Sequence, residues 1–467
     1  MMKRLLAFLV AGLCALPALA QELPASVSAA LKAAQIPLSG VAVVVQPVDG
    51  KTPIVSHNAK AVMNPASVMK LLTTYAALDL LGPAFTWHTD ALADNPPRDG
   101  RLIGNLYLRG SGDPKFAIEH FTALLRQLRV RGVQQIAGDL VLDRSAFNIA
   151  TTDPGAFDDK PMRPYNIGPD ALLINFQALR FTLLPDNGRL QILLETPSDG
   201  LRVDNKLQLT QRDCGSDWKD QINLRLLPET SGNRLEFSGS YASGCAEKNL
   251  NLAPLSGDAQ VAGLFRALWK ELGGSFTGTI RAGNTPANAR LLARQESPPL
   301  ADVVRDINKH SNNVMARQLF LTLANGNGPA TPEAARRRID EWLAGRGLKF
   351  DKLVIENGSG LSRDERIRGE DLNRLLINAW QSPIMPELVS SLPIAGIDGT
   401  MKKRLKESEA SGRAHIKTGT LNGVKTAAGF ALDSRGRRVA VTFLINHPRA
   451  QLGQPAIDAL LLWVAQQ

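Results

Sequence analysis

Apolar positions in the first third of the chain change from strand-like to helix-like spacing. Short apolar runs at residues 41–45 and 53–56, separated by Asp49-Gly50, predict two strands of a β-hairpin. A longer apolar run covers residues 67–81 and stops at Gly82, which predicts a helix that begins at Ser67. The chain is therefore expected to open with two strands and one helix.

Strand-like patterns dominate the next 170 or so residues. One amphipathic helix is predicted at residues 117–130, where apolar positions recur every three or four residues. A stretch rich in Gly, Pro and Asp, residues 153–169, is expected to be irregular. The predicted strands are residues 87–92, 101–108, 136–142, 172–176, 180–184, 190–194, 206–210, 222–226 and 234–238. Residues 86–255 are thus expected to form a β-rich insert of one or two accessory domains.

Helical patterns return after residue 255, and strands follow near the end. Helices are predicted at residues 261–272, 302–324, 332–343, 370–380 and 456–464, and strands at 415–418, 427–433 and 439–445. The Ser311-Asn312-Asn313 cluster is a poor helix interior and a good helix start, so a break is expected near Ser311. Residues 21–85 and 256–467 are therefore expected to form one α+β domain, with helices on both faces of an antiparallel sheet.

The first twenty residues have the organisation of a secretory signal. Lys3 and Arg4 precede an apolar stretch, and Ala18-Leu19-Ala20 is a small-x-small cleavage site. This pattern predicts export to the periplasm and a mature chain that begins at Gln21. No later apolar run is long enough to span a bilayer.

Charge and cysteine usage narrow the possible partners and the compartment. Of the 54 basic and 44 acidic residues, only Lys3 and Arg4 lie in the leader, so the remainder carries a formal charge of +8. This excess favours anionic envelope polymers and at most peripheral contact with a membrane. No basic-aromatic module of a nucleic-acid-binding protein is present. Cys214 and Cys245 are expected to pair, which would stabilise the fold by roughly 3–4 kcal/mol, the alternative being two free buried thiols.

A serine and a lysine at the start of the 67–81 helix are the first candidates for chemistry. Ser67 and Lys70 are three residues apart, so the hydroxyl and the amine share one helix face. A lysine activates a serine nucleophile only if burial or neighbouring cations lower its pKa. The alternative is a helix-capping serine and a solvated lysine. A second Ser-x-x-Lys, Ser216 to Lys219, is expected to be extended, which would separate its two side chains.

Two further motifs complete the set that serine–lysine acyl enzymes require. Lys417-Thr418-Gly419 occurs once, at the end of a predicted strand, and is followed by Thr420. Ser-x-Asn occurs three times, and only Ser311-Asn312-Asn313 lies in the helical part at a predicted helix break. All three motifs are in the required order, which favours acyl-transfer catalysis over chance.

The sequence resembles the D-alanyl-D-alanine carboxypeptidase/endopeptidase family, the class C low-molecular-mass penicillin-binding proteins. Besides the three motifs, the resemblance covers Gly112-Asp113-Pro114, Gly138-Asp139-Leu140, residues 356–363 and residues 394–400. The gap of 244 residues between Ser67 and Ser311 is also similar, because this family places accessory domains there. The resemblance implies a serine β-lactamase/penicillin-binding-protein transpeptidase-like fold.

The resemblance also implies roles for individual residues. Ser67 would attack a D,D-peptide bond of a peptidoglycan stem peptide or cross-link, Lys70 would accept its proton, and Ser311 would relay a proton to the leaving amine. Asn313, Lys417, Thr418, Gly419 and Thr420 would bind the substrate, and β-lactams would be covalent inhibitors. Similar acidic residues in relatives imply a contact of Asp158 and Asp159 with a substrate side chain, although a solvated loop pair is the alternative.

Other activities remain open from the sequence alone. A β-lactamase would need a deacylating base that is not evident, and a silent envelope-binding protein would not need the intact motifs. The six histidines lack the spacing of metal ligands, so neither a metal nor an organic cofactor is expected.

Overall fold

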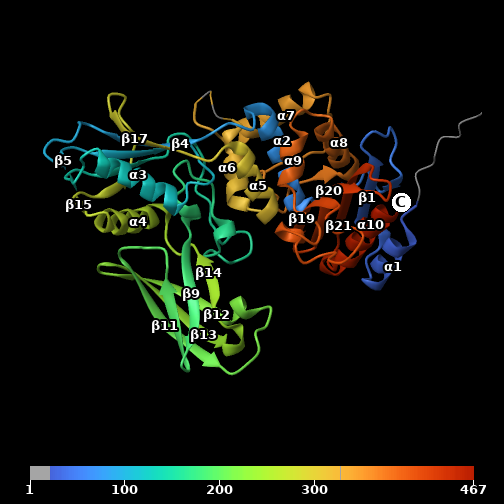
Figure 1. Cartoon of the computed structure of the whole chain (residues 1–467), viewed down its shortest axis with the longest axis horizontal. Coiled ribbons are helices and arrows are strands. Elements are labelled where there is room, and N and C mark those ends of the chain that lie inside the picture. Colours follow the sequence, from blue (N-terminus) through green and yellow to red (C-terminus); the bar gives the residue numbers. More distant parts are fainter. Residues whose placement is uncertain (1–21, 325, 327) are drawn as a thin grey trace, which may run out of the picture.

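The computed structural model describes residues 22–324, 326 and 328–467. The expected signal sequence, residues 1–20, lies outside the described residues. Three groups of elements are visible in Figure 1: a helix-rich group around β1 and β19–β21, a second group around α3, α4 and β17, and a strand-rich group from β9 to β14.

A five-stranded antiparallel sheet, ordered β19-β20-β21-β1-β2, organises the first group. The predicted hairpin is confirmed, because β1 and β2 pair antiparallel. β1 also pairs with β21, so the first and last strands share one sheet, as predicted. The strands are β1 (Val41–Pro47), β2 (Val55–His57), β19 (Ala414–Leu421), β20 (Val424–Leu432) and β21 (Arg438–Asn446).

Helices cover both faces of this sheet, which explains why β1 is apolar and buried from Val41 to Val45. Val41, Val43 and Val45 face one core, which α1 (Ala25–Ala33) and α10 (Gln454–Gln466) complete. Ala42 faces the other and larger core. That core includes side chains of α2 (Lys70–Leu81), α5 (Leu300–His310), α6 (Asn313–Thr322), α7 (Pro332–Gly345), α8 (Gly369–Trp380) and α9 (Met385–Ser391).

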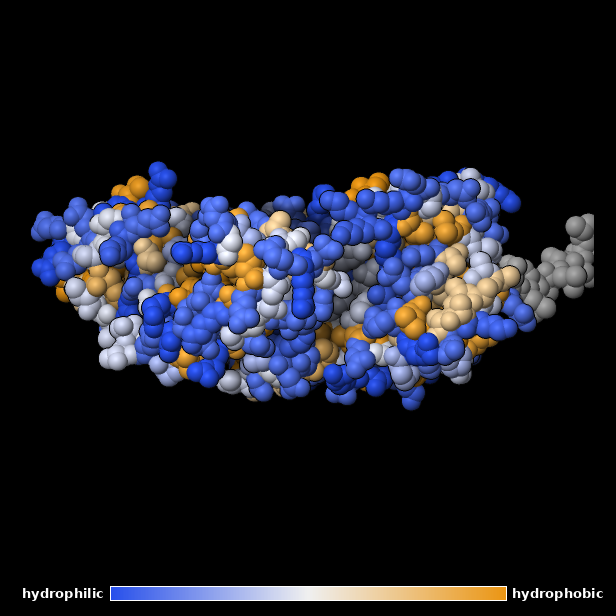
Figure 2. All heavy atoms as spheres, turned by 90° about the horizontal axis from the view of Figure 1, so that it is seen from below, coloured by the Kyte–Doolittle hydropathy of each residue, from blue (hydrophilic) through white to orange (hydrophobic). Residues whose placement is uncertain are grey.

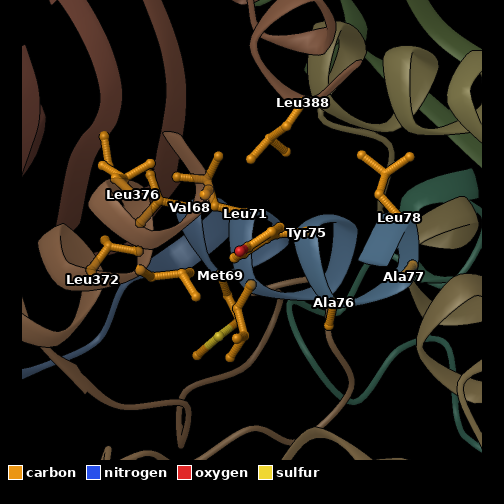
Figure 3. Close-up of a cluster of buried hydrophobic side chains, with 14 of the residues drawn as sticks. Val68, Met69, Leu71, Tyr75, Ala76, Ala77, Leu78, Leu372, Leu376 and Leu388 are labelled. Atoms are coloured by element: carbon orange, nitrogen blue, oxygen red, sulfur yellow. The ribbon is translucent and has the colours of Figure 1, made fainter. Parts of the chain in front are cut away.

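Helix α2 lies at the centre of the larger core. Figure 3 shows Leu71, Tyr75 and Leu78 of α2 among leucines from α8 and α9. Nine of the twelve residues of α2 are buried, so the helix is surrounded by protein on nearly all sides. The position of its first turn is therefore fixed by packing on every side.

The second group is an α/β unit in which strands from distant parts of the chain pair. Its two sheets are ordered β16-β8-β6-β4-β17 and β15-β7-β5, and α3 and α4 share their core. The elements are β4 (His88–Ala93), β5 (Arg101–Leu102), β6 (Leu106–Gly110), α3 (Ile118–Val130), β7 (Gln135–Ile136), β8 (Leu140–Asp143), α4 (Gly257–Glu271), β15 (Ser275–Phe276), β16 (Ile280–Ala282) and β17 (Arg290–Glu296).

Two strands predicted as continuous are each interrupted. The predicted strand 101–108 is divided into β5 and β6, and 136–142 into β7 and β8. A side chain at Gly138 would place its Cβ 2.1 Å from the carbonyl oxygen of Gly104, so the two interruptions touch. Glycine allows the two segments to approach this closely. The pattern of apolar residues does not reveal the contact, so both strands were predicted as continuous.

The third group contains two three-stranded sheets around a separate core. Cys214 and Cys245 form the expected disulfide beside this core, and Cys245 is buried. The strands are β9 (Leu179–Asp186), β10 (Arg189–Leu194), β11 (Leu201–Thr210), β12 (Ile222–Glu229), β13 (Gly232–Ala242) and β14 (Lys248–Leu252). The predicted strand 172–176 is wrong: Leu172, Leu173 and Ile174 are buried in an irregular segment.

The strand pairing does not stop at residue 255, where the insert was expected to end. β15 and β16 pair with β7 and β8, and β17 pairs with β4. Helix α4 also packs into the core of the α/β unit. We therefore propose that the accessory region extends from residue 86 to about residue 297 and that the α+β domain resumes at α5. The sequence pattern missed this because the pairing joins segments more than 130 residues apart.

The surface is polar over most of the face shown in Figure 2, with several small apolar patches between hydrophilic residues. Among the residues that the structure describes, no helix has the length and apolar character needed to cross a membrane.

The disulfide should stabilise the β9–β14 unit without affecting the distant α+β domain. Replacing both Cys214 and Cys245 by Ala frees a loop whose ends are 31 residues apart, so we expect the unit to lose up to about 4 kcal/mol of stability. Calorimetry should show a lower transition for this unit, while the rate of labelling by a penicillin stays unchanged. A slower labelling rate with unchanged stability would contradict this division.

Candidate active site

Ser67 lies in a tight turn that leads into α2. Residues Ala66–Met69 form a 3₁₀ turn, and α2 proper begins at Lys70, so the predicted helix start is a turn rather than a capped α-helix. Ser67 is half-buried, and its Oγ lies 3.1 Å from Lys70 Nζ. Gly360 packs against this turn, where a Cβ would lie 2.0 Å from the carbonyl oxygen of Ala66. A glycine at 360 is therefore required for the turn to sit where it does.

The amine of Lys70 is fully buried and contacts three oxygen atoms. Besides Ser67 Oγ, it contacts Asn313 Oδ1 at 2.6 Å and the carbonyl oxygen of Ser359. Burial lowers the pKa of Lys70 well below its ordinary value, and the nearby Lys417 lowers this pKa further. A neutral amine has two N–H groups and one lone pair. Asn313 and Ser359 accept the two N–H groups, which leaves the lone pair to accept the hydroxyl proton of Ser67.

Ser311 and Asn313 lie at the predicted break between two helices. α5 ends at His310, Ser311 adopts a left-handed conformation (φ 55°, ψ 40°), and α6 begins at Asn313. The side chain of Asn312 caps α6 by accepting the backbone N–H of Met315. The break therefore places Ser311 beside Lys417 and Asn313 beside Lys70.

Lys417 joins strand β19 to Ser311. Its Nζ donates to Ser311 Oγ and to the carbonyl oxygen of Thr418, both at 2.8 Å. The side chain is fully buried, and this burial lowers the pKa of Lys417 to about 7. The motif lies inside β19 rather than at the end of a strand, because β19 continues to Leu421.

Strand β19 passes directly beside the serine turn. A Cβ on Gly419 would lie 2.9 Å from the backbone nitrogen of Ser67, and Thr426 on β20 donates to the carbonyl oxygen of Pro65. Thr420 is exposed next to this contact. The structure thus brings the three motifs together from α2, the α5–α6 connection and β19.

The second Ser-x-x-Lys does not have the geometry of the first. Trp218–Gln221 form a 3₁₀ turn, so the stretch is not extended as expected. Ser216 is exposed, and the amine of Lys219 lies over the ring of Trp218.

Asp158 and Asp159 lie in the irregular loop that faces the 356–364 segment. Asp158 accepts hydrogen bonds from Tyr165 Oη and Asn166 Nδ2, both at 2.7 Å, whereas Asp159 is exposed. A cavity of about 560 Å³ opens beside this loop, and its lining among the described residues includes Phe157 and Arg363 but neither aspartate. Their contact with a substrate side chain stays a prediction.

A buried carboxyl group behind Lys70 was not found from the sequence. Glu365 is fully buried, accepts the backbone N–H groups of Glu356 and Asn357, and has one oxygen without a partner among the described residues. Burial raises the pKa of Glu365 to about 7, while those two N–H groups and Lys70 oppose the shift. The only sequence clue to a role for Glu365 is its place shortly after Gly358-Ser359-Gly360, because no local pattern shows that a glutamate is buried.

A serine beside a buried lysine, on a helix packed beneath an antiparallel sheet, defines the class of serine peptidase and β-lactamase-like folds. The family model for the D-Ala-D-Ala carboxypeptidase 3 (S13) family matches residues 23–467. The chain belongs to this family of serine-type peptidases, as the motifs predicted.

Sequence identity to two D-alanyl-D-alanine carboxypeptidases supports this assignment. The chain is 28% identical to D-alanyl-D-alanine carboxypeptidase DacB of Haemophilus influenzae over 402 residues, which cover 84% of this chain and 82% of that one. It is 29% identical to D-alanyl-D-alanine carboxypeptidase of Actinomadura sp. strain R39 over 417 residues, 85% of this chain and 76% of that one.

Solved structures show the same fold. The crystal structure of penicillin binding protein 4 of Haemophilus influenzae has a TM-score of 0.78 and 26% identity, and the match covers 94% of this chain and 99% of that one. A predatory endopeptidase of Bdellovibrio bacteriovorus has a TM-score of 0.53 at 15% identity, over 91% of this chain and 94% of that one. The predicted transpeptidase-like α+β fold is therefore confirmed.

The buried amine of Lys417 should make stability depend on pH. Between pH 7 and the ordinary pKa of lysine near 10, the unfolded chain binds a proton at Lys417 that the native state does not. Raising the pH in this window must therefore stabilise the wild type. Relative to Lys417→Met, we expect a gain in the free energy of unfolding of up to about 1.4 kcal/mol per pH unit, measured by denaturant unfolding. Parallel pH curves for the two proteins would refute a lowered pKa at Lys417.

Proposed function

We propose that this protein is a serine D,D-peptidase that acts on peptidoglycan stem peptides through an acyl-enzyme at Ser67. It would release terminal D-alanine, cleave D,D cross-links, or do both. One observation carries the proposal: Lys70 has two acceptors for the N–H groups of a neutral amine, and Ser67 lies at its third contact. The names of the relatives, which are D-alanyl-D-alanine carboxypeptidases, support the choice of substrate.

In the first step, Ser67 Oγ attacks the carbonyl carbon between two D-residues while its proton passes to Lys70 Nζ. The charge that develops on the carbonyl oxygen is stabilised by the backbone N–H groups of Ser67 and Thr420. A Cβ on Gly419 would lie 2.9 Å from the Ser67 nitrogen, so β19 passes close to this N–H group, which supports the proposed role of the neighbouring Thr420.

In the second step, the bond to the leaving amine breaks and that amine takes up a proton. Ser311 supplies the proton and is itself replenished through its hydrogen bond with Lys417. Asn313 holds Lys70 in place and hydrogen-bonds the substrate peptide. Water then attacks the ester carbon: one water proton passes through Ser311 to Lys417, the proton on Lys70 returns to Ser67 Oγ, and the shortened peptide leaves with a free carboxyl group.

The terminal carboxylate of the substrate is bound beside β19. Thr418 and Thr420 present hydroxyl groups on the open side of this strand, and Lys417 supplies the nearest cation. A β-lactam carries a carboxylate in a similar position and acylates Ser67, but its ester is released slowly. A β-lactam-bound form of the Haemophilus influenzae penicillin binding protein 4 supports this inhibitor class.

We further propose that the enzyme acts in the periplasm. The leader pattern at residues 1–20 and the Cys214–Cys245 disulfide support export to an oxidising compartment. The excess of basic residues supports attraction to anionic envelope polymers and peripheral contact with a membrane.

Replacing the nucleophile tests the proposal. Ser67→Ala should abolish labelling by a fluorescent penicillin and the release of D-alanine and uncrosslinked muropeptides from purified sacculi. Ser216→Ala is the matched control, because it removes the serine of the second Ser-x-x-Lys, and both activities should survive there.

Two outcomes would reject the proposal. Labelling of Ser67→Ala at the wild-type rate would remove Ser67 as the nucleophile. Rapid turnover of the penicillin by the wild type, without action on sacculi, would favour a β-lactamase.

A further inference from the structure

A short loop, residues 394–400, lies between the C-terminal end of α5, which Ser311 follows, and β19, which carries Lys417. Its first residue forms an isolated bridge with His415. Its last residue, Thr400, contacts Thr418. The family resemblance singled out this loop, but the proposed mechanism gives it no role.

A buried ion pair fixes the loop to α5. Lys309 is buried, and its Nζ donates to Asp398 Oδ2 at 2.7 Å and to the carbonyl oxygen of Leu392 at 2.6 Å. The other carboxylate oxygen of Asp398 accepts the backbone N–H of Ile394 at 2.8 Å. Asp398 therefore joins both ends of the loop to the helix that precedes Ser311.

Gly399 allows the loop to approach α5 closely. Its φ is +54°, and a Cβ there would lie 2.7 Å from the carbonyl oxygen of Lys309. Any other residue would combine an unfavourable backbone conformation with a clash. The position of Thr400, the next residue, is therefore fixed by the packing of Gly399 against α5 and by the contact of its own hydroxyl with Thr418.

The hydroxyl groups of Thr400 and Thr418 form a hydrogen bond of 2.8 Å at the mouth of the site. Thr400 is exposed, Thr418 is half-buried, and the hydrogen bond between their hydroxyl groups is exposed. A hydroxyl has one proton and two lone pairs. If Thr400 donates to Thr418, the proton of Thr418 is free to point outward to an acceptor.

Lys417 alone does not supply all the hydrogen bonds that a bound carboxylate needs, so a further donor such as the Thr418 hydroxyl can contribute. Its Nζ already donates to Ser311 and to the carbonyl oxygen of Thr418, and its side chain is completely buried. Burial lowers the pKa of Lys417 to about 7, so near neutrality this cation carries only part of its charge. Binding a carboxylate at β19 must then depend strongly on correctly directed hydroxyl protons.

We propose that Thr400 is a positioning residue for substrate recognition: its hydroxyl, held in place by the Lys309–Asp398 pair, directs the hydroxyl proton of Thr418 toward the free carboxylate of the substrate's leaving residue. The inference rests on the proposed function of this site. Through this contact, residues 394–400 would make the enzyme prefer peptides whose leaving residue carries an ionised α-carboxylate, whether that residue ends the peptide or belongs to a cross-link.

The test compares two substrates on Thr400→Val, which keeps the shape of the side chain but removes its hydroxyl. For diacetyl-L-Lys-D-Ala-D-Ala with a free carboxylate, KM should rise about tenfold with kcat nearly unchanged. For the same peptide with a C-terminal carboxamide, kinetics of wild type and variant should agree. Thr400→Ser should restore the wild-type KM, and the exposed Thr277→Val, on the α/β unit, is the matched control.

A second variant tests the loop anchor. Asp398→Asn removes the charge that binds Lys309 and should raise KM for the free acid in the same direction, with the carboxamide unaffected. A KM for Thr400→Val within twofold of the wild type, or an equal rise for both substrates, would overturn the inference while leaving the proposed function intact. A wild type that releases no D-alanine would instead overturn the proposed function, and this inference with it. Equal melting temperatures of wild type and Thr400→Val exclude misfolding.

Discussion

The site depends on a lysine amine that is buried beside a serine hydroxyl. Taking an ammonium group out of water costs several kcal/mol, so burial favours the neutral amine of Lys70. The cost is offset because Asn313 and Ser359 accept its hydrogens. Ser67 then faces a lone pair instead of a cation. A proton acceptor is therefore produced by burial and hydrogen bonding, without a histidine or a metal in the proposed mechanism.

The rest of the α+β domain fixes the positions of this amine and of the groups that it contacts. Helix α2 is buried on nearly all sides, which fixes Lys70 at its first residue (Figure 3). The acceptors come from separate places: Asn313 from the start of α6 and Ser359 from a glycine-rich loop. Gly360 and Gly419 allow that loop and β19 to reach the serine turn, because a side chain at either position would collide with it. Each contact joins segments far apart in the sequence, so the site exists only in the folded domain.

Sequence patterns predicted the parts of the site that carry their own local signal. Ser67 and Lys70 share a helix face by spacing, and the Ser311–Asn313 cluster predicted a helix break because asparagine and serine favour helix starts. The apolar run at residues 41–45 predicted a strand of a hairpin, and the element order predicted a sheet shared by the first and last strands; the pairing of β1 with β2 and β21 confirms both. What the patterns missed depends on long-range contacts. The pairing of β15–β17 with β4, β7 and β8, the burial of Glu365 and the Lys309–Asp398 pair have no local sequence signal.

Direct titration of Lys70 tests the account most closely. Protein labelled with ¹³C at lysine Cε, with the Lys70 resonance assigned by its loss in Lys70→Met, would report the pKa of this amine by NMR. We predict a midpoint well below the ordinary lysine value of about 10.4, and a rise of this midpoint when Lys417 is replaced by Met, because the charge of Lys417 lowers the pKa of Lys70. A midpoint for Lys70 at or above that ordinary value would contradict it, because Ser67 would then face a cation with no lone pair to accept its proton.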